Sequence, residues 1–423
     1  MAQESTPLPV ANAETVGTAS ETDPRANGLM RGSPPPEDKR VVLSNALEFP
    51  QLRWSASHWR ELAPTQRVSR GTGAAAPLPR NERDLSGVRI RTLTGADMRF
   101  PEALEATYLD GLVVLHNGSI VFEEYRGEGG PDQPHLCFSV TKSMVGMLAV
   151  DLIVQGLIDD RARVTRYVPE LDCETFGDAT VRNILDMTIA ARWSENYADP
   201  AAEIRSYGVP SGLRERSADY TGPTHLADYL PNAMQRNGEH GKAFVYITPL
   251  SDVLAWIVVR ASGKPLSQLL SERVWAPMGA EHDAYFNVDS VGAAVAGVGF
   301  SCALRDMARV GELLRCRGSL MGQRVFDPQV CDALFQPASA QEKAVFAAGA
   351  FASLKEWSYR NQWWMTNNAS GAITARGIYG QALYIDPKAE VVIARFASMP
   401  TASNLANDHI SLPLYQAIAD ALA

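Results

Sequence analysis

The stretch that follows Lys142 constrains the fold most strongly, because it predicts a helix that is apolar on nearly every face. This stretch runs through Val150 to Gly156 and has apolar residues at 145, 147, 148, 150, 152 and 153. A helix that is hydrophobic all round belongs in the interior of a protein rather than on its surface. We therefore expect this helix at the centre of the fold, with its N-terminus opening into a pocket.

A serine and a lysine lie one helical turn apart at the start of this helix, in Ser139-Val140-Thr141-Lys142. Residues at i and i+3 share a helix face, with Cβ atoms about 5–6 Å apart, so the amine can take the serine proton. Unpaired backbone N–H groups at the helix start also favour developing negative charge. Because a serine needs such a base to become a nucleophile, the pattern predicts a serine hydrolase. The alternative is an ordinary serine followed by a solvated lysine.

Composition and charge narrow the function further. The 423 residues are 46% hydrophobic and carry a net charge of −9, which argues against a nucleic-acid partner. No apolar run approaches bilayer length, so we expect no membrane partner. The first seven residues lack the basic start and apolar core of a signal peptide, so we expect a cytoplasmic protein. The five cysteines and seven histidines show neither C-x-x-C nor H-E-x-x-H spacing, so we expect no disulfide framework, no metal and no cofactor.

Two hairpins are predicted near opposite ends of the chain. Asn117-Gly118 separates the apolar runs 112–116 and 120–125, and Asn-Gly suits a tight turn because both residues tolerate positive φ. Residues 386–390 separate two further apolar runs and predict a second hairpin. A final helix is expected over about 402–422.

This arrangement predicts an α+β fold with an antiparallel sheet built from both chain ends. Residues 1–45 are rich in Ala, Pro, Ser, Thr and Glu, and we expect them to form a disordered tail. One domain would follow over 46–423. Its sheet lobe would span about 46–160 and 311–423, and a mostly helical lobe would be inserted at about 161–310.

Two further segments could complete an active site. Tyr246-Ile247-Thr248 precedes a predicted helix, where a tyrosine can face a cleft and share a proton with a lysine, although it can equally be a core tyrosine. Gly377 and Gly380 flank the start of the late hairpin, where glycine lets a backbone N–H approach a ligand as an oxyanion donor. The alternative there is an ordinary glycine turn. G-x-S-x-G is absent, which argues against an α/β-hydrolase.

The order Ser139-x-x-Lys142, Tyr246-Ile247-Thr248 and a late glycine-containing edge strand resembles the serine β-lactamase and penicillin-binding superfamily. More closely, the chain resembles the nylon-oligomer hydrolases (6-aminohexanoate-dimer hydrolases), which share the class C β-lactamase fold and are related to family VIII esterases. The resemblance covers about residues 45–423 in collinear order. It is carried further by 167–171, 184–187, Glu195-Asn196-Tyr197-Ala198-Asp199-Pro200, 252–258, 301–311, Gln362-Trp363-Trp364 and Gly377-Ile378-Tyr379-Gly380-Gln381.

The resemblance implies a β-lactamase/transpeptidase-like fold and a role for each matched residue. Ser139 would be the nucleophile, Lys142 its base, and Tyr246 the group that relays the proton to the leaving group. The backbone N–H groups of Ser139 and Ile378 would form the oxyanion hole, with Ile378 positioned by the adjoining glycine. The remaining matches are Tyr197, a substrate-contacting tyrosine, and Trp364, a tryptophan near the site, and the adjoining glycine is Gly377.

The chain also departs from these families. Where β-lactamases have K-T-G, this chain has Ala375-Arg376-Gly377, so a β-lactam carboxylate would lose its lysine partner unless Arg376 replaces it. At positions where dimer hydrolases can carry an acidic or polar side chain, this chain aligns Gly208 and Gly297. These residues leave open how strong the activity on the linear dimer is.

We therefore expect a serine hydrolase that cleaves carboxylic esters and small linear amides through an acyl-enzyme. The substrate would be a small molecule, and a homodimer is left open. The alternatives are a β-lactamase or DD-peptidase-like enzyme, and a catalytically silent binding protein on the same fold.

Overall fold

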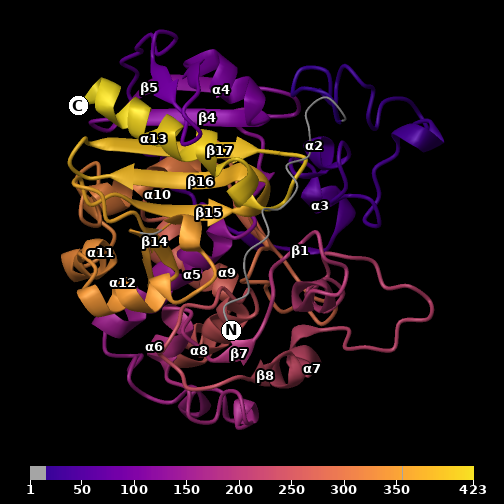
Figure 1. Cartoon of the computed structure of the whole chain (residues 1–423), viewed down its shortest axis with the longest axis vertical. Helices are drawn as coiled ribbons and strands as arrows, with labels where there is room; N and C mark the ends of the chain where they lie inside the picture. The colour runs from indigo at the N-terminus through magenta and orange to yellow at the C-terminus, as the bar shows by residue number, and fades with distance from the viewer. Residues whose placement is uncertain (1–15, 355) are drawn as a thin grey trace.

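A computed structural model of the chain describes residues 16–354 and 356–423. Its main feature is a seven-stranded antiparallel sheet that joins strands from both ends of the sequence, which confirms the predicted α+β fold (Figure 1). Both predicted hairpins are present, around Asn117-Gly118 and around 386–390. In spatial order the strands are β13 (Ser358–Arg360), β14 (Trp363–Met365), β15 (Ile373–Gly377), β16 (Gln381–Asp386), β17 (Val391–Ala397), β4 (Leu109–His116) and β5 (Ser119–Tyr125).

Both faces of this sheet are covered, and the alternation of side chains along its strands explains why. Leu112 and Val114 of β4 point into one cluster together with residues of α4 (Phe100–Ala106) and α13 (Asp408–Leu422). Val113 and Leu115 point to the opposite face, where α10 (Leu304–Arg315) packs. Since successive strand residues face opposite sides, a strand covered on both faces is apolar throughout, as β4 nearly is.

The apolar helix is α5 (Val140–Val154), and it lies in the interior as predicted. Every residue from Val140 to Leu152 is buried. The helix packs against α8 (Leu250–Ser262) and against the sheet strands β14, β15 and β16. Its close approach to the segment before β14 requires Gly146, where a Cβ would lie 2.2 Å from the carbonyl oxygen of Asn361. The start of α5 is therefore held between the sheet and the helices of the second lobe.

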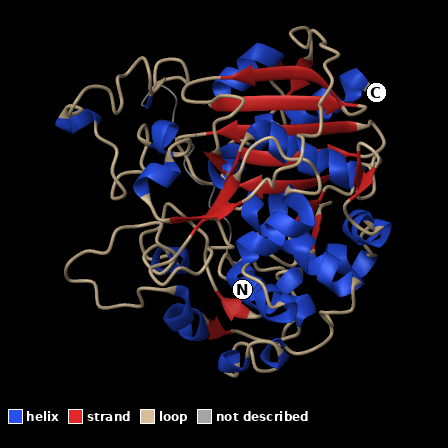
Figure 2. Cartoon of the chain, turned by 180° about the vertical axis from the view of Figure 1, so that it is seen from behind, coloured by secondary structure: helices blue, strands red, loops and turns tan. Residues whose placement is uncertain are grey.

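The helices of the predicted lobe, 161–310, are concentrated in its second half, where α8 lies. Residues 161–249 are mostly loops with short helices, gathered below the sheet in Figures 1 and 2. Glycine and proline at 208, 210, 212, 222 and 223 interrupt any longer helix there. A four-stranded sheet links the end of the predicted lobe to the N-terminal part of the chain, in the order β1 (Thr65–Val68), β9 (Ala284–Asn287), β10 (Phe300–Cys302) and β6 (His135–Leu136). The lobe boundaries themselves stay a prediction.

The remaining elements are short. The strands are β1 (Thr65–Val68), β2 (Arg89–Arg91), β3 (Asp97–Arg99), β6 (His135–Leu136), β7 (Ala191–Arg192), β8 (Gln235–Arg236), β9 (Ala284–Asn287), β10 (Phe300–Cys302), β11 (Ser319–Leu320) and β12 (Gln323–Arg324). The helices are α2 (Leu52–Ser55), α3 (Trp59–Leu62), α6 (Val181–Leu185), α7 (Leu226–Tyr229), α9 (Leu266–Leu270), α11 (Pro328–Phe335) and α12 (Ala340–Ala347).

Two predictions about the chain ends need correction. The sequence predicts a disordered tail over 1–45. Residues 1–15 lie outside the described residues, but several side chains of 16–45 pack on the folded body, with Leu29 and Val41 in the main core. Composition misled here, because a few buried apolar residues spaced among prolines suffice to anchor a segment that has almost no regular structure. The last helix, α13, begins at Asp408 rather than near 402, because Asn404–Ala406 forms a separate 3-10 turn.

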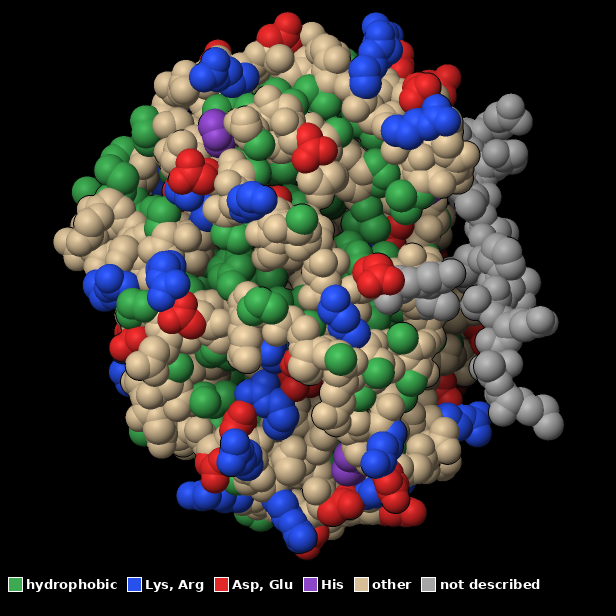
Figure 3. Space-filling view, turned by 60° about the vertical axis from the view of Figure 1, so that its left-hand side comes forward, with side chains coloured by type: hydrophobic (Ala, Val, Ile, Leu, Met, Phe, Trp, Pro, Cys, Tyr) green, Lys and Arg blue, Asp and Glu red, His purple; other side chains and the backbone are tan. Residues whose placement is uncertain are grey.

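Acidic and basic side chains are interspersed over the face shown in Figure 3, without a large patch of one sign. Within the described residues, no helix is both long and apolar enough to cross a bilayer.

Candidate active site

Ser139 is the N-cap residue of α5 and lies in contact with Lys142 on the first turn. The Lys142 Nζ is 2.9 Å from the Ser139 Oγ and donates a hydrogen bond to it. Phe138, immediately before the serine, has a φ of 46°, a strained value for a non-glycine residue. Cys137, the residue before Phe138, donates its N–H to the Phe300 carbonyl at 2.8 Å, which joins it to strand β10 of the four-stranded sheet. This fixed entry into the helix holds the Ser139 hydroxyl over the amine.

Lys142 is 1% exposed, and its burial lowers the pKa of the ammonium to about 8. Burial disfavours a charged amine, while the nearby carboxylates of Glu195 and Asp252 oppose this effect in part. The Nζ also donates to the Gly297 carbonyl at 2.5 Å. Asp252 holds that carbonyl in place, because its Oδ1 accepts hydrogen bonds from the Ala296 and Gly297 N–H groups. The lysine is thus positioned by backbone as well as by the serine.

Tyr246 lies beside this pair, as the predicted order of motifs requires. The Lys142 Nζ is 5.2 Å from the centre of the Tyr246 ring, and the Ser139 side chain is near enough to the phenol to act on its pKa. Burial raises the pKa of the Tyr246 phenol well above its usual range, with the Glu195 charge acting in the same direction. The phenol therefore stays protonated at neutral pH. Trp364 packs behind it at 5.5 Å between ring centres.

Gly377 ends strand β15, close to the start of α5. A Cβ at this position would lie 2.5 Å from the Cys137 carbonyl oxygen, so only glycine allows the two backbones to approach this closely. The approach places Ile378, the next residue, near the start of α5, where Ser139 lies. Among the described residues neither the Ile378 N–H nor the Ser139 N–H has a hydrogen-bond acceptor in the protein. An oxyanion hole requires backbone donors free of protein acceptors, so these two N–H groups stay the predicted pair.

Tyr197 and Tyr246 lie on loops that a single carboxylate joins. Glu195 accepts four hydrogen bonds, from the Tyr197 hydroxyl at 2.9 Å, the Trp193 indole, and the backbone and hydroxyl of Thr248. Because the Tyr197 proton goes to Glu195, the phenol oxygen keeps its lone pairs available for a donor from outside. Burial and the Glu195 charge raise the pKa of Tyr197, which therefore stays neutral.

The three positions of departure have clear structural roles. Arg376 pairs with Asp408 and stacks over Trp364 at 5.3 Å, so its guanidinium is already engaged. A side chain at Gly297 would collide with Tyr207 and Thr248, since a Cβ would lie 2.7 Å from an atom of each. Gly208 has helical backbone angles and lies against the Arg214 side chain.

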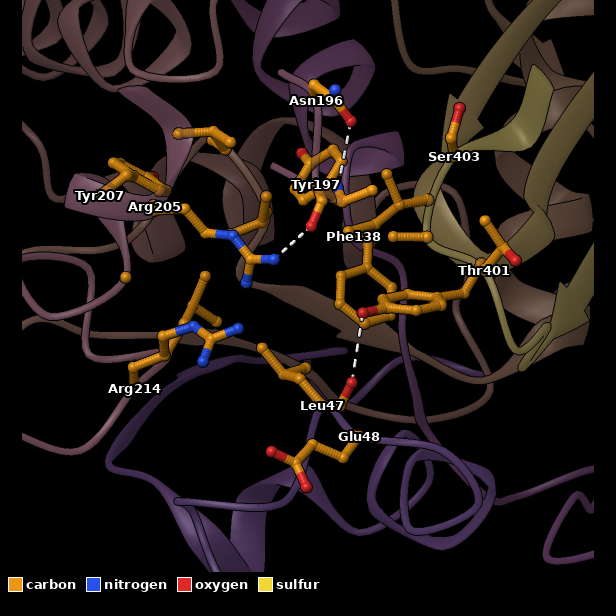
Figure 4. A pocket seen from close by; sticks show the side chains of 18 of the residues that line it. Leu47, Glu48, Phe138, Asn196, Tyr197, Arg205, Tyr207, Arg214, Thr401 and Ser403 are labelled. Carbon is orange, nitrogen blue, oxygen red and sulfur yellow. Dashed lines mark hydrogen bonds between the residues drawn. The ribbon is translucent and has the colours of Figure 1, made fainter. Parts of the chain in front are cut away.

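A pocket of about 560 Å³ lies next to Phe138 and Ile378 (Figure 4). Its walls come from three stretches that are far apart in the sequence, 47–49, 196–214 and 400–403. The stretch 47–49 is tied to the sheet edge, because the Tyr379 hydroxyl donates to the Leu47 carbonyl at 3.3 Å. Of the predicted site residues, Tyr197 and Ile378 line this pocket, whereas Ser139 is adjacent in sequence to its lining residue Phe138 and is not itself part of the lining.

Sequence reasoning missed four participants, which are Glu195, Asp252, Arg205 and Arg214. Glu195 could have been suspected, since it lies two residues before Tyr197 in a matched loop. Asp252 is fully buried at the start of α8, but its sequence position reads equally well as an acidic residue that stabilises the N-terminus of a helix. The two arginines lie in a loop region without periodicity, so no local signal marks them.

Three comparisons bear on this site. The beta-lactamase family matches residues 102–411. The 6-aminohexanoate-dimer hydrolase of Paenarthrobacter ureafaciens is 35% identical over 360 residues, which is 85% of this chain and 88% of that protein.

Among solved structures, a Bacillus anthracis protein assigned as a 6-aminohexanoate-dimer hydrolase has a TM-score of 0.83 and 30% identity, covering 92% of this chain and 98% of its own. A family VIII carboxylesterase, at 18% identity and a TM-score of 0.51 over 73% of this chain and 92% of its own, shares the fold.

Proposed function

The chain belongs to the beta-lactamase family and, within it, with the 6-aminohexanoate-dimer hydrolases, and on that premise we propose that it cleaves carboxylic esters and small linear amides through an acyl-enzyme on Ser139. The observation that carries this proposal is the contact of Ser139 with a buried lysine whose pKa is lowered to about 8. At pH 7 about a tenth of such a lysine is a neutral amine, which can accept a proton.

In the acylation step, Lys142 takes the proton of the Ser139 hydroxyl as Oγ attacks the substrate carbonyl. The carbonyl oxygen becomes an oxyanion between the N–H groups of Ser139 and Ile378. When the bond to the leaving group breaks, Tyr246 gives its proton to the departing alcohol or amine and recovers one from Lys142. A water molecule then attacks the acyl-enzyme by the same route and releases the acid and the free serine.

The geometry supports the division of roles between lysine and tyrosine. Burial lowers the pKa of Lys142 and raises that of Tyr246. Environments that push two neighbouring pKa values apart favour one group as the base and the other as the proton donor. Here the base would be Lys142 and the donor Tyr246.

The two alternatives have less support. A β-lactamase or DD-peptidase would need a free cation at the K-T-G position, but Arg376 is paired with Asp408. A silent binding protein would have no need of a buried lysine against a serine hydroxyl, because burying an ammonium carries a desolvation cost. We also propose a cytoplasmic location and a small ester or amide as partner, with no nucleic acid or membrane, and leave a homodimer open.

A fluorophosphonate probe and a substrate panel test the proposal. The probe should label the wild type on Ser139, and the panel would comprise p-nitrophenyl acetate and butyrate, 6-aminohexanoate dimer and nitrocefin. Ser139→Ala should lose both labelling and turnover. Ser143→Ala is the matched control, because that hydroxyl donates to the Gln362 carbonyl at 2.7 Å instead of facing Lys142. An esterase rate that survives in Ser139→Ala would overturn the assignment.

A further inference from the structure

The pocket beside Phe138 contains more positive than negative charge. Its charged lining residues are Arg205, Arg214 and Glu48. Figure 4 shows both guanidinium groups extending from the same wall in the direction of Phe138, with Glu48 on another wall. A pocket with two guanidinium groups and one carboxylate attracts an anion.

Neither arginine is neutralised inside the described part of the chain. Arg205 donates through one Nη to the Tyr197 carbonyl, and its buried Nε has no hydrogen-bond partner there. Arg214 is exposed toward the pocket, and no carboxylate of the described residues lies within 4.0 Å of it. An unpaired buried donor of a charged group is costly, so a carboxylate that bonds Arg205 would remove that cost.

Gly208, on the same side of the pocket as the two arginines, also favours binding of an anion. Gly208 has no side chain to counter the arginines, and the space its Cβ would occupy adjoins the Arg214 side chain, 2.7 Å from Cδ. A substrate ammonium in this region would therefore meet guanidinium groups rather than a carboxylate. Like charges at short range disfavour binding.

The position of the pocket identifies which part of a substrate enters it. Phe138, next to the nucleophile Ser139, and Ile378, the oxyanion donor of the proposed function, line the pocket, whereas Ser139 itself and Tyr246, the donor to the leaving group, do not. A substrate with its carbonyl on Ser139 would thus extend its acyl group, not its leaving group, into this space.

We propose that the enzyme prefers esters and amides whose acyl chain ends in a carboxylate, bound by Arg205 and Arg214. This inference rests on the proposed function, because it places the substrate carbonyl on Ser139. The chemical class is the half-ester or half-amide of a linear dicarboxylic acid. Hydrolysis would release the free diacid, with the new carboxyl oxygen supplied by water.

Three p-nitrophenyl esters with six-carbon acyl chains test the inference: the half-ester of adipic acid, the neutral hexanoate, and the cationic 6-aminohexanoate. The eight-carbon half-ester of suberic acid tests the reach of the pocket. In the wild type, we expect kcat/KM for an anionic ester to exceed that for the cationic ester by at least about tenfold. This preference should shrink as ionic strength rises, because salt screens an exposed guanidinium.

Variants of Arg214 separate attraction from packing. Arg214→Gln should lower the ratio of anionic to neutral kcat/KM by about tenfold, and Arg214→Glu should reverse the preference in favour of the cationic ester. Arg216→Gln is the matched control, since Arg216 is an exposed arginine two residues away that does not line the pocket.

A ratio that is the same in the wild type, Arg214→Gln and Arg214→Glu would overturn the carboxylate site. If that happens while hexanoate hydrolysis still requires Ser139, only this inference fails. If hexanoate hydrolysis survives in Ser139→Ala, the proposed function itself fails.

Discussion

The catalytic centre and the acyl pocket lie side by side but are built in different ways. Ser139 and Lys142 lie on the first turn of a helix buried on all sides, beside the end of an inner strand of the sheet. The pocket is walled by loops from three distant stretches, and its charged groups reach solvent. In the catalytic centre, burial lowers the pKa of Lys142 and so sets its protonation state. In the pocket, the arginines keep their charge and are positioned only by contacts with nearby loop residues.

This difference teaches where chemistry and selectivity are encoded. A change in the buried centre should affect every substrate, since each one uses the same nucleophile and base. A change in the pocket should affect substrates according to their charge and shape. The predictions below test whether this separation holds.

The largest effect is expected from Lys142→Ala, which removes the base and should lower kcat by at least about 10²-fold for esters and amides alike. In the wild type, kcat/KM for a neutral ester should rise about tenfold per pH unit up to about pH 8 and then level off. The sign follows from the role of Lys142, because only the deprotonated amine accepts the serine proton and its pKa is about 8. A pH–rate profile measures both effects, and a profile flat between pH 6 and 9 would contradict the assignment.

Tyr246→Phe should also lower kcat by about 10²-fold, but mainly for amides. An amine needs a proton to depart, whereas p-nitrophenolate leaves without one. Parallel kinetics on an amide and a p-nitrophenyl ester measure the difference. Equal losses on the two substrates would show that Tyr246 is structural, through its packing on Trp364.

Much of the catalytic centre could be predicted from sequence, because its key contact is local. Ser139 and Lys142 are three residues apart, and helix geometry alone brings them together. Tyr246, Ile378 and Trp364 needed family resemblance, since their approach depends on tertiary packing. The sheet was also predictable, because two hairpins carry strong turn signals.

The pocket could not be predicted in the same way. Its walls join loops separated by more than a hundred residues, and a loop has no period that fixes the direction of a side chain. Residues 16–45 show the same limit, because composition predicted disorder while Leu29 and Val41 are in fact core residues. Where burial depends on a distant partner, local sequence does not reveal it.

Tyr197 lies on the boundary between the two regions, because it lines the pocket and is joined through Glu195 to Thr248, near Tyr246. Tyr197→Phe therefore tests to which region the residue belongs. Loss of its oxygen should weaken amide hydrolysis by about 3- to 10-fold, the value of one uncharged hydrogen bond of roughly 0.5–1.5 kcal/mol. Ester hydrolysis should be spared, because an ester has no N–H to donate. Comparing kcat/KM for matched ester and amide substrates measures this, and an equal loss on the ester would place Tyr197 with the catalytic centre.

The smallest effect is expected from Gly208→Asp. From sequence alone, an aspartate here should improve kcat/KM for the linear dimer by pairing with its ammonium. The structure reduces that expectation, since the new carboxylate would lie against Arg214 and pair with it first. We therefore expect a gain of only a few fold on the dimer, and a larger one in Gly208→Asp/Arg214→Gln. Dimer hydrolysis assays on the single and double variants test this, and a double variant no better than the single would exclude pairing with Arg214.

The pairing of β4 with β17 also determines how late in translation the central sheet can be completed. His116 pairs with Val391, so on a ribosome β4 emerges roughly 275 residues before the strand that completes it. At 5–20 residues per second, that interval lasts about 14–55 s. During it, the edge of β4 that pairs with β17 has no partner strand. The pocket forms later still, because its lining includes residues 400–403 as well as residues 47–49. Translation is therefore nearly complete before the chain can become a hydrolase.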